Sequence, residues 1–294
     1  MLTNLQPTAK LPSRVVVLGA GGFIGGAILQ RLQTDAISVL ALDMPECDLL
    51  GPDAAQSLAT KLRAEDTLIF ISAKAPCRNQ AMLLDNLRMC AAVSMALRLQ
   101  PVSHVIYQSS DAVYRDVHEP ISEAACAEPG TLHGLMHLAR EVMLKSDFSG
   151  PLTCIRPTLV YGLNDPHNGY GPNRFRRLAA GGREIVLFGE GEELRDHVFV
   201  EDLAELARLV VLHRSVGTVN AVSGEVVSFR TLAEFCADRF SPRVPVKGSP
   251  RSGPMPHDGY RAFAPSAALR AFPGFRFTPW REGLACVCAQ MKAS

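Results

Sequence analysis

The sequence lacks an excess of charge of either sign. It holds 30 Lys and Arg residues against 29 Asp and Glu residues, a formal net charge of +1 at pH 7. Binding to nucleic acid or to an anionic membrane depends on accumulated positive charge. The balance therefore gives no electrostatic support for either as the main partner.

A long apolar run is also missing. The stretch 15–29, which follows Lys10 and Arg14, superficially resembles a secretory leader. It is shorter than the roughly 20 residues that span a bilayer. Glycines interrupt it, and no Ala-x-Ala cleavage signal follows it. We therefore expect neither a leader nor a membrane span here.

No Cys-x-x-Cys motif occurs among the eight cysteines, and Cys286-x-Cys288 is the only close pair. A chain of 294 residues with 47% apolar residues can build a core without disulfides. The irregular spacing therefore favours a reducing, cytoplasmic location, with most thiols acting as small core side chains.

Short β-rich runs alternate with helical runs in the first half. The predicted strands are 15–18, 39–42, 67–71 and 105–108, and the predicted helices are 23–32, 89–99 and 132–144. Continuously apolar strands between helices predict a parallel sheet covered on both faces. The expected fold class is α/β, with a doubly wound, Rossmann-type sheet.

The composition changes after about residue 162. Two loops rich in Gly, Pro, Asn and Asp, 163–174 and 241–259, surround the predicted helices 201–212 and 229–240. We expect a Rossmann domain over 1–162. A smaller α/β substrate domain would cover 163–294, with some of its segments returning to the first domain.

A glycine turn joins the first strand to the first helix. Gly19 permits a tight turn, Gly22 lets the backbone approach a pyrophosphate, and Gly25 lets the helix pack closely on the strand. The helix starts at Phe23 and Ile24, where free N–H groups and the positive end of the dipole favour phosphate. The context predicts dinucleotide binding.

Asp43 ends the next predicted strand, 18 residues after Gly25. A carboxylate there can accept both ribose hydroxyls of an adenosine and would repel a 2′-phosphate. No Arg or Lys lies in 44–50 to offset that repulsion. The predicted cofactor is therefore NAD rather than NADP.

Further segments follow in a fixed order. They are Cys47-Asp48-Leu49, Ile71-Ser72-Ala73, Ser109-Ser110-Asp111-Ala112-Val113-Tyr114, Arg156-Pro157-Thr158-Leu159-Val160-Tyr161-Gly162, Phe188-Gly189-Glu190-Gly191-Glu192-Glu193-Leu194-Arg195-Asp196 and Val200-Glu201-Asp202-Leu203-Ala204. With the glycine turn, they resemble the extended short-chain dehydrogenase/reductase family, which includes nucleotide-sugar epimerases and dehydratases. The resemblance covers nearly the whole chain.

This resemblance implies an NAD cofactor, a nucleotide-sugar substrate and a set of binding residues. Those implied for the cofactor, besides the glycine turn and Asp43, are Asp48, Leu49, Ser72, Ala73, Ser109 and Pro157. Those implied for the nucleotide diphosphate are Asn173, Arg174, Arg195 and Arg251. Members of the family commonly form homodimers through a four-helix contact, which the apolar helices 89–99 and 135–144 would suit.

The sequence departs from the family at its catalytic Tyr-x-x-x-Lys. His133 and His137 stand in place of the tyrosine and the lysine, while Gly134 and Glu141 keep the register. An imidazole, with a reference pKa of about 6.5, takes a proton near neutrality without a lysine to activate it. His137 is shorter than lysine and is charged only when protonated.

Three interpretations of this pair stay open. His133 acts as an altered acid/base, with Ser110 polarising the same oxygen; or the redox site is degenerate while ligand binding persists; or His133, His137 and Glu141 bind a metal. The Gly134 register explains the histidines without a metal. We therefore expect none.

Asp111 offers a second indication about the reaction. Sugar 4,6-dehydratases of this family carry Asp and then Glu at this point, whereas here Ala112 follows Asp111. The missing carboxylate argues against elimination of water. Asp111 remains a candidate proton donor or sugar ligand.

The leading hypothesis is an NAD-binding nucleotide-sugar isomerase or epimerase that works by transient hydride transfer. The catalytic candidates are Ser110, Asp111, His133 and His137. The first alternative is a non-redox rearrangement, such as a pyranose–furanose mutase. The second is a non-catalytic sensor of NAD or a nucleotide sugar.

Overall fold

The computed structural model describes residues 2–293, and within them seven strands form one large sheet. From edge to edge these are β1 (Thr3–Asn4), β10 (Ser215–Ala221), β6 (Leu152–Pro157), β5 (His104–Gln108), β4 (Thr67–Phe70), β2 (Val15–Leu18) and β3 (Val39–Leu42). Neighbouring strands are parallel, except that β1 pairs antiparallel with β10. The expectation of a mostly parallel α/β sheet is confirmed.

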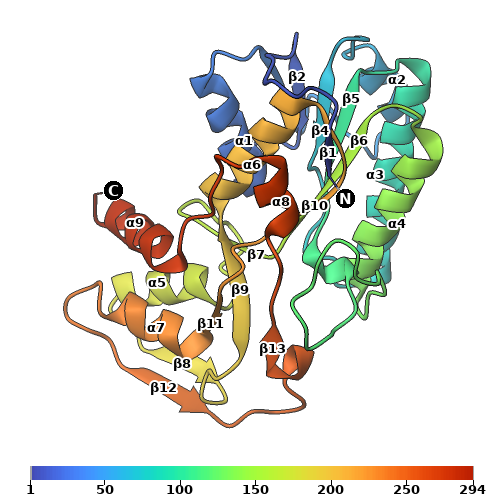
Figure 1. Cartoon of the computed structure of the whole chain (residues 1–294). Helices are drawn as coiled ribbons and strands as arrows, with labels where there is room; N and C mark the ends of the chain where they lie inside the picture. Colours follow the sequence, from blue (N-terminus) through green and yellow to red (C-terminus); the bar gives the residue numbers. More distant parts are fainter. Residues whose placement is uncertain (1, 294) are drawn as a thin grey trace.

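Helices cover both faces of this sheet. On one face lie α1 (Phe23–Thr34), α6 (Val200–His213) and α8 (Ser266–Ala271), and on the other α2 (Ala54–Ala59), α3 (Gln80–Leu99) and α4 (Leu132–Asp147) (Figure 1). Successive side chains of β2 point to opposite faces of the sheet, so the strand contributes to the hydrophobic core on each face. Val15 and Val17 pack toward α1 and α6, while Val16 and Leu18 pack toward α3 and α4.

Several predicted boundaries were wrong; α1 and α4 also run two and three residues past their predicted ends. Helix α3 begins nine residues before the predicted residue 89, because the side chain of Asn79 caps the amide of Met82 at 2.9 Å. A buried polar residue, Asn86, interrupts the apolar pattern there by bonding to the backbone of Lys74. Helix α7 (Phe229–Ala237) ends before the predicted residue 240. The last residues of the predicted loop 163–174 instead open α5 (Pro172–Ala180).

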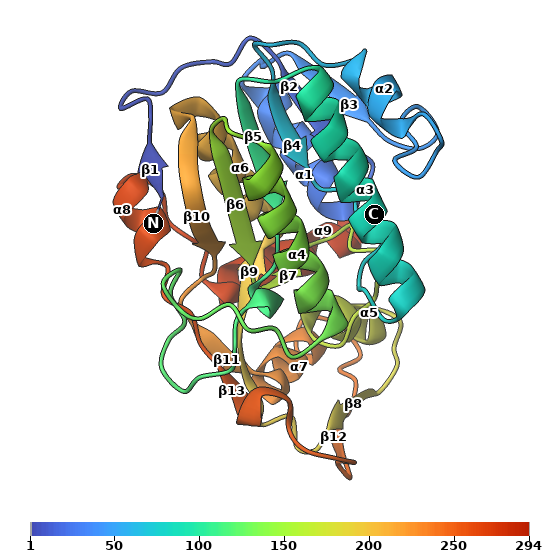
Figure 2. The same ribbon diagram turned by 90° about the vertical axis from the view of Figure 1, so that its right-hand side faces the viewer.

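The second half forms a smaller region beneath the carboxyl ends of the large sheet's strands (Figures 1 and 2). Strand β9 (Leu194–Phe199) pairs with β7 (Leu159–Tyr161), β11 (Val226–Ser228) and β13 (Tyr260–Arg261), and β8 (Ile185–Phe188) pairs with β12 (Val246–Ser249). Helices α5, α7 and α9 (Trp280–Ala293) pack around these strands. Strand β10 belongs to the large sheet and α6 packs on that sheet. The predicted division into two domains at 162/163 stays a prediction.

All eight cysteines are free thiols, and only Cys126 and Cys286 are exposed. The other six pack as small core side chains, as expected for most of them. Across residues 2–293, no helix combines the length and the apolar character that crossing a membrane requires.

Candidate active site

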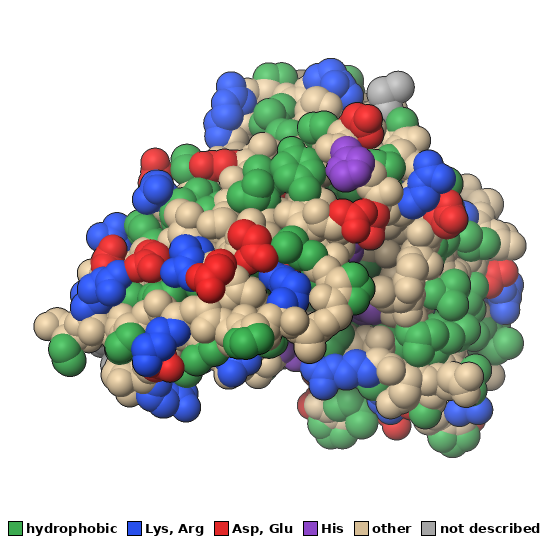
Figure 3. Space-filling model, turned by 90° about the horizontal axis from the view of Figure 1, so that it is seen from below, with side chains coloured by type: hydrophobic (Ala, Val, Ile, Leu, Met, Phe, Trp, Pro, Cys, Tyr) green, Lys and Arg blue, Asp and Glu red, His purple; other side chains and the backbone are tan. Residues whose placement is uncertain are grey.

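A cavity of about 850 Å³ lies at the carboxyl ends of the strands of the large sheet. Histidine side chains are visible in the hollow seen from below (Figure 3). All residues predicted to hold the cofactor except Gly25 line the cavity, and so do three of the four catalytic candidates. These residues are Gly19, Gly22, Phe23, Ile24, Asp43, Asp48, Leu49, Ser72, Ala73, Ser109, Ser110, His133, His137 and Pro157.

The glycine turn forms a bare cradle at one end of this cavity. Gly19 has a φ of 101°, and a Cβ on it would lie 2.8 Å from the amide nitrogen of Ser72. Gly22 is the N-cap of α1, and no side chain caps that helix end. The free N–H groups of the first turn therefore remain available to an anion.

Gly25 lies behind the cradle rather than in its lining. A Cβ there would lie 2.0 Å from the carbonyl oxygen of Gly19, so only glycine allows α1 to pack this closely on the turn. The carboxylate of Asp43 accepts a hydrogen bond from the Gly21 amide and faces the cavity. The residues present thus fit the diphosphate and the adenosine ribose of a dinucleotide.

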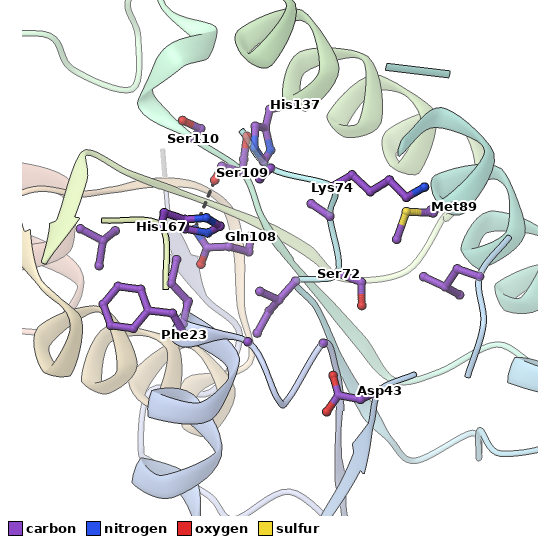
Figure 4. A pocket seen from close by; sticks show the side chains of 18 of the residues that line it. Phe23, Asp43, Ser72, Lys74, Met89, Gln108, Ser109, Ser110, His137 and His167 are labelled. Atoms are coloured by element: carbon purple, nitrogen blue, oxygen red, sulfur yellow. Dashed lines mark hydrogen bonds between the residues drawn. The ribbon is translucent and has the colours of Figure 1, made fainter. Parts of the chain in front are cut away.

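Two histidines on α4 mark the opposite end, where Figure 4 shows His137 and Ser110 far from Asp43. The rings of His133 and His137 lie 4.7 Å apart, edge to face at 85°. Burial lowers the pKa of His133, although the charge of Asp111 opposes that shift. Burial, His133 and Arg140 together hold the pKa of His137 well below its usual value. Both imidazoles are therefore neutral at pH 7.

The two rings differ in how firmly they are held. The Nδ1 atom of His137 lies 2.8 Å from the hydroxyl of Tyr107. The Nδ1 atom of His133 lies 3.4 Å from the amide nitrogen of Cys77, beyond the usual range of about 2.7–3.2 Å. The ring of His133 is therefore held less firmly than that of His137.

A buried ionic network supports the wall between β5 and β6. Glu141 of α4 accepts hydrogen bonds from Arg156 at 2.6 and 2.8 Å and from the hydroxyl of Ser109 at 2.6 Å. Burial raises the pKa of Glu141, but the hydrogen bonds and charge of Arg156, the Ser109 hydroxyl and the charge of Lys145 together outweigh it and leave the pKa lowered. Glu141 is thus a structural anion. No three His, Cys, Asp or Glu side chains in residues 2–293 are grouped to hold a metal.

Asp111 is not part of the cavity lining. Its carboxylate lies 3.3 Å from the Nε atom of the buried Arg261, and the same guanidinium bonds to the Asp111 carbonyl at 2.8 Å. Ser110 does line the cavity, and its hydroxyl caps the amide of Ala112 at 3.1 Å. Asp111 therefore anchors β13 to this segment.

None of the four predicted substrate residues lines the cavity. Asn173 bonds to the backbone of Val160 and Gly162, and Arg174 is exposed on α5. Arg195 pairs with Glu193 at 2.8 Å. Arg251 bonds to the Phe188 carbonyl at 3.2 Å and lies 3.4 Å from Glu192. Their roles toward a substrate stay predictions.

A family model described as the NAD dependent epimerase/dehydratase family matches residues 15–222, more than half of the chain. The chain belongs to this family. The match starts at β2 and ends just after β10, so it covers the whole glycine-turn site and both histidines. The resemblance inferred from the motifs is confirmed, and so is the expected nicotinamide dinucleotide cofactor.

Individual family members are distant from this chain. UDP-glucose 4-epimerase of Mycolicibacterium smegmatis is 27% identical over 65% of this chain and 71% of its own length. GDP-L-fucose synthase 1 of Arabidopsis thaliana is 28% identical over 76% of each chain. The solved structure of Thermus thermophilus UDP-glucose 4-epimerase with NAD superposes with a TM-score of 0.84, at 21% identity, over 96% and 99% of the two chains. This last likeness supports the fold.

The epimerase/dehydratase site also contains residues that the sequence analysis did not select. Lys74, Met89, Gln108, Asp165 and His167 line the cavity as well (Figure 4). Lys74 follows Ser72 and Ala73 directly, which is the one sequence signal that would have indicated it. Gln108 likewise directly precedes the Ser109-Ser110 segment, whereas Met89 on α3 and the loop residues Asp165 and His167 lie outside the family motifs.

Proposed function

We propose that this protein is an NAD-dependent epimerase or isomerase of nucleotide sugars in which His133 is the acid/base. One observation carries the proposal: a dinucleotide cradle and two neutral imidazoles line the same cavity. When bound in this cavity, NAD⁺ would supply reversible hydride transfer at a sugar carbon. Under this proposal the glycine turn holds the diphosphate and Asp43 holds the ribose.

His133 would exchange a proton with the reacting sugar hydroxyl. It is neutral at pH 7, so one of its ring nitrogens can accept a proton without prior deprotonation. Ser110 lines the same end of the cavity and can hydrogen-bond the same oxygen. A phenol, with a reference pKa of about 10, would need a neighbouring cation for this task, whereas an imidazole does not.

The test is a kinetic isotope effect. Wild-type protein is incubated with NAD⁺ and UDP-glucose or GDP-mannose, each with a fully deuterated hexose. Sugar products are followed by NMR. We expect slower turnover of the deuterated sugar, and at least a 100-fold loss of turnover in His133→Phe, whereas His118→Phe, on an exposed histidine outside the cavity, keeps wild-type rates. Full turnover by His133→Phe would overturn the acid/base role.

One observation favours the two alternatives. His137 is buried and neutral, so it cannot supply the charge that a lysine would supply there. Turnover without an isotope effect would support a mutase-type rearrangement. Tight binding of NAD or a nucleotide sugar, without turnover over a wide sugar panel, would support a sensor.

We also propose a homodimer formed through α3 and α4, which lie side by side on one face (Figure 2). Apolar side chains are exposed along both helices: Leu84, Met95 and Leu99 on α3, and Leu135 and Val142 on α4. Two copies of this stripe would form a four-helix contact. Light scattering should give twice the chain mass, and Met95→Glu with Val142→Glu should give the monomer mass. A monomeric wild type would contradict the proposed dimer. The cytoplasmic location expected from the cysteines stays a prediction.

A further inference from the structure

The phenol of Tyr107 and the imidazole of His137 form a hydrogen-bonded pair behind the cavity. Tyr107 lies on β5 and is fully buried, and His137 lies on α4 with 6% of its surface exposed. Their Oη–Nδ1 distance of 2.8 Å is that of a full hydrogen bond. One proton must therefore lie between the two atoms. Whether Tyr107 or His137 donates it determines whether the Nε2 atom of His137 carries a proton.

The donor in this hydrogen bond can be identified by asking which assignment leaves no buried polar group unpaired. No other acceptor for the Tyr107 hydroxyl occurs within residues 2–293. If Nδ1 carried the proton, the phenol would accept and its own buried O–H would be left unpaired, which costs free energy. If the phenol donates, both groups are satisfied and the proton of the imidazole lies on Nε2. Burial also raises the pKa of Tyr107, so the phenol keeps its proton.

The surroundings keep His137 uncharged. Arg140, one turn along α4, is fully buried, and no carboxylate of the described residues pairs with it. Its Nη2 atom donates to the carbonyl of Ser72 at 2.8 Å, and its Cζ atom lies 4.1 Å from the Phe70 ring centre. This cation and the nearby ring of His133 both disfavour an imidazolium at His137.

We propose that Tyr107 is a positioning residue that fixes His137 as the Nε2–H tautomer. His137 thereby presents a neutral hydrogen-bond donor to the cavity, because Nδ1 is turned toward Tyr107 and the remaining edge of the ring faces the lining. Its partner is a hydroxyl oxygen of the bound dinucleotide, a step that rests on the proposed function. The donor carries no charge, and the neighbouring cation Arg140 is turned toward Ser72.

The first test needs no cofactor and no activity. The 15N–1H spectra of the imidazole rings in the purified protein distinguish the Nε2–H tautomer, the Nδ1–H tautomer and the imidazolium. His137→Gln assigns the signal. We expect the pure Nε2–H pattern in the wild type at pH 7. An Nδ1–H or imidazolium pattern would overturn the proposal, whether or not any variant folds.

Two tyrosine variants then separate positioning from general loss of structure. Tyr107→Phe should convert the His137 signal to a mixture of tautomers and weaken NAD binding, measured by calorimetry, about 3- to 10-fold. Tyr114→Phe is the matched control, because it also removes a buried phenol bond, to Asn220 at 2.7 Å, away from His137. That control should leave the His137 pattern unchanged. An unchanged pattern in Tyr107→Phe would refute the positioning role.

Replacing His137 itself tests which nitrogen matters. Gln places an amide donor near the position of Nε2, whereas Asn places one near Nδ1. We expect His137→Gln to keep NAD affinity within about 3-fold and His137→Asn to lose more. Equal losses would contradict the assigned donor. If the wild type shows the Nε2–H tautomer but binds no NAD, the proposed function fails while the Tyr107–His137 geometry stands.

Discussion

The cofactor side and the substrate side differ in how many of their predicted residues line the cavity. On the cofactor side, residues from the ends of five strands and from helices α1, α3 and α4 converge on one cavity, and almost every predicted position lines it. On the substrate side, the predicted Arg195 and Arg251 lie apart from it, each beside a glutamate. The register of a parallel sheet fixes where strand ends meet. Arg195 lies on β9 of a separate small sheet and Arg251 lies in a loop, so the register of the large sheet fixes neither.

The comparison predicts first that stability depends on the cofactor side. Arg156→Met leaves Glu141 buried without its main partner, so unfolding free energy should fall by about 3–5 kcal/mol, measured by urea denaturation. Arg251→Met removes a looser, half-exposed pair on the substrate side and should cost less than about 1 kcal/mol. Equal losses would show that the two sides do not differ.

Close packing at the glycine turn predicts the second largest effect. Gly25→Ala places a Cβ 2.0 Å from the Gly19 carbonyl, so α1 must move off the turn. NAD affinity should fall about 100-fold, or ~2.7 kcal/mol, by calorimetry. Gly26→Ala is the matched control, since its Cβ would meet nothing closer than 3.6 Å. Comparable affinities in the two variants would refute this account of the turn.

Asp43 tests the preference for NAD. Asp43→Asn removes the charge that would accept ribose hydroxyls, so NAD affinity should fall about 10- to 100-fold while NADP affinity changes little or rises. Glu46→Gln, an exposed neighbour outside the lining, should leave both affinities unchanged. A parallel loss of NAD and NADP affinity would assign Asp43 to holding the Gly21 amide alone.

The cavity residues that directly follow strand ends could be predicted from the sequence. The turn after β2, Asp43 after β3, Ser72 after β4 and Ser109 after β5 were all predicted and all reach the cavity. Tyr107 and Arg140 were missed because each reads as an ordinary element of its strand or helix. The packing of α4 against β5 brings the Tyr107 hydroxyl to His137 and places the Arg140 guanidinium over the Tyr107 ring. Likewise, no local pattern shows that Asp111 faces Arg261, which lies 150 residues away.

Replacing Arg195 tests whether the substrate side binds a nucleotide diphosphate. If it binds a diphosphate, Arg195→Gln should weaken UDP or GDP binding about 3- to 10-fold and leave NAD affinity unchanged. Glu193→Gln should act in the opposite direction, because it releases Arg195 from its 2.8 Å pair. Losses in both variants would mean that the pair is structural and that the diphosphate binds elsewhere.

The smallest expected effect is a displacement of the pH profile. The working form of His133 is neutral and burial lowers its pKa, so turnover should stay level from pH 8 to about 6.5 and fall only at lower pH. The charge of Asp111 raises that pKa, so Asp111→Asn should move the acid limb further toward low pH. Asp116→Asn, which also loses a contact with Arg261, controls for loosening of β13. An acid limb that stays in place in Asp111→Asn would show that the carboxylate does not act on His133 and that Asp111 serves only to hold Arg261.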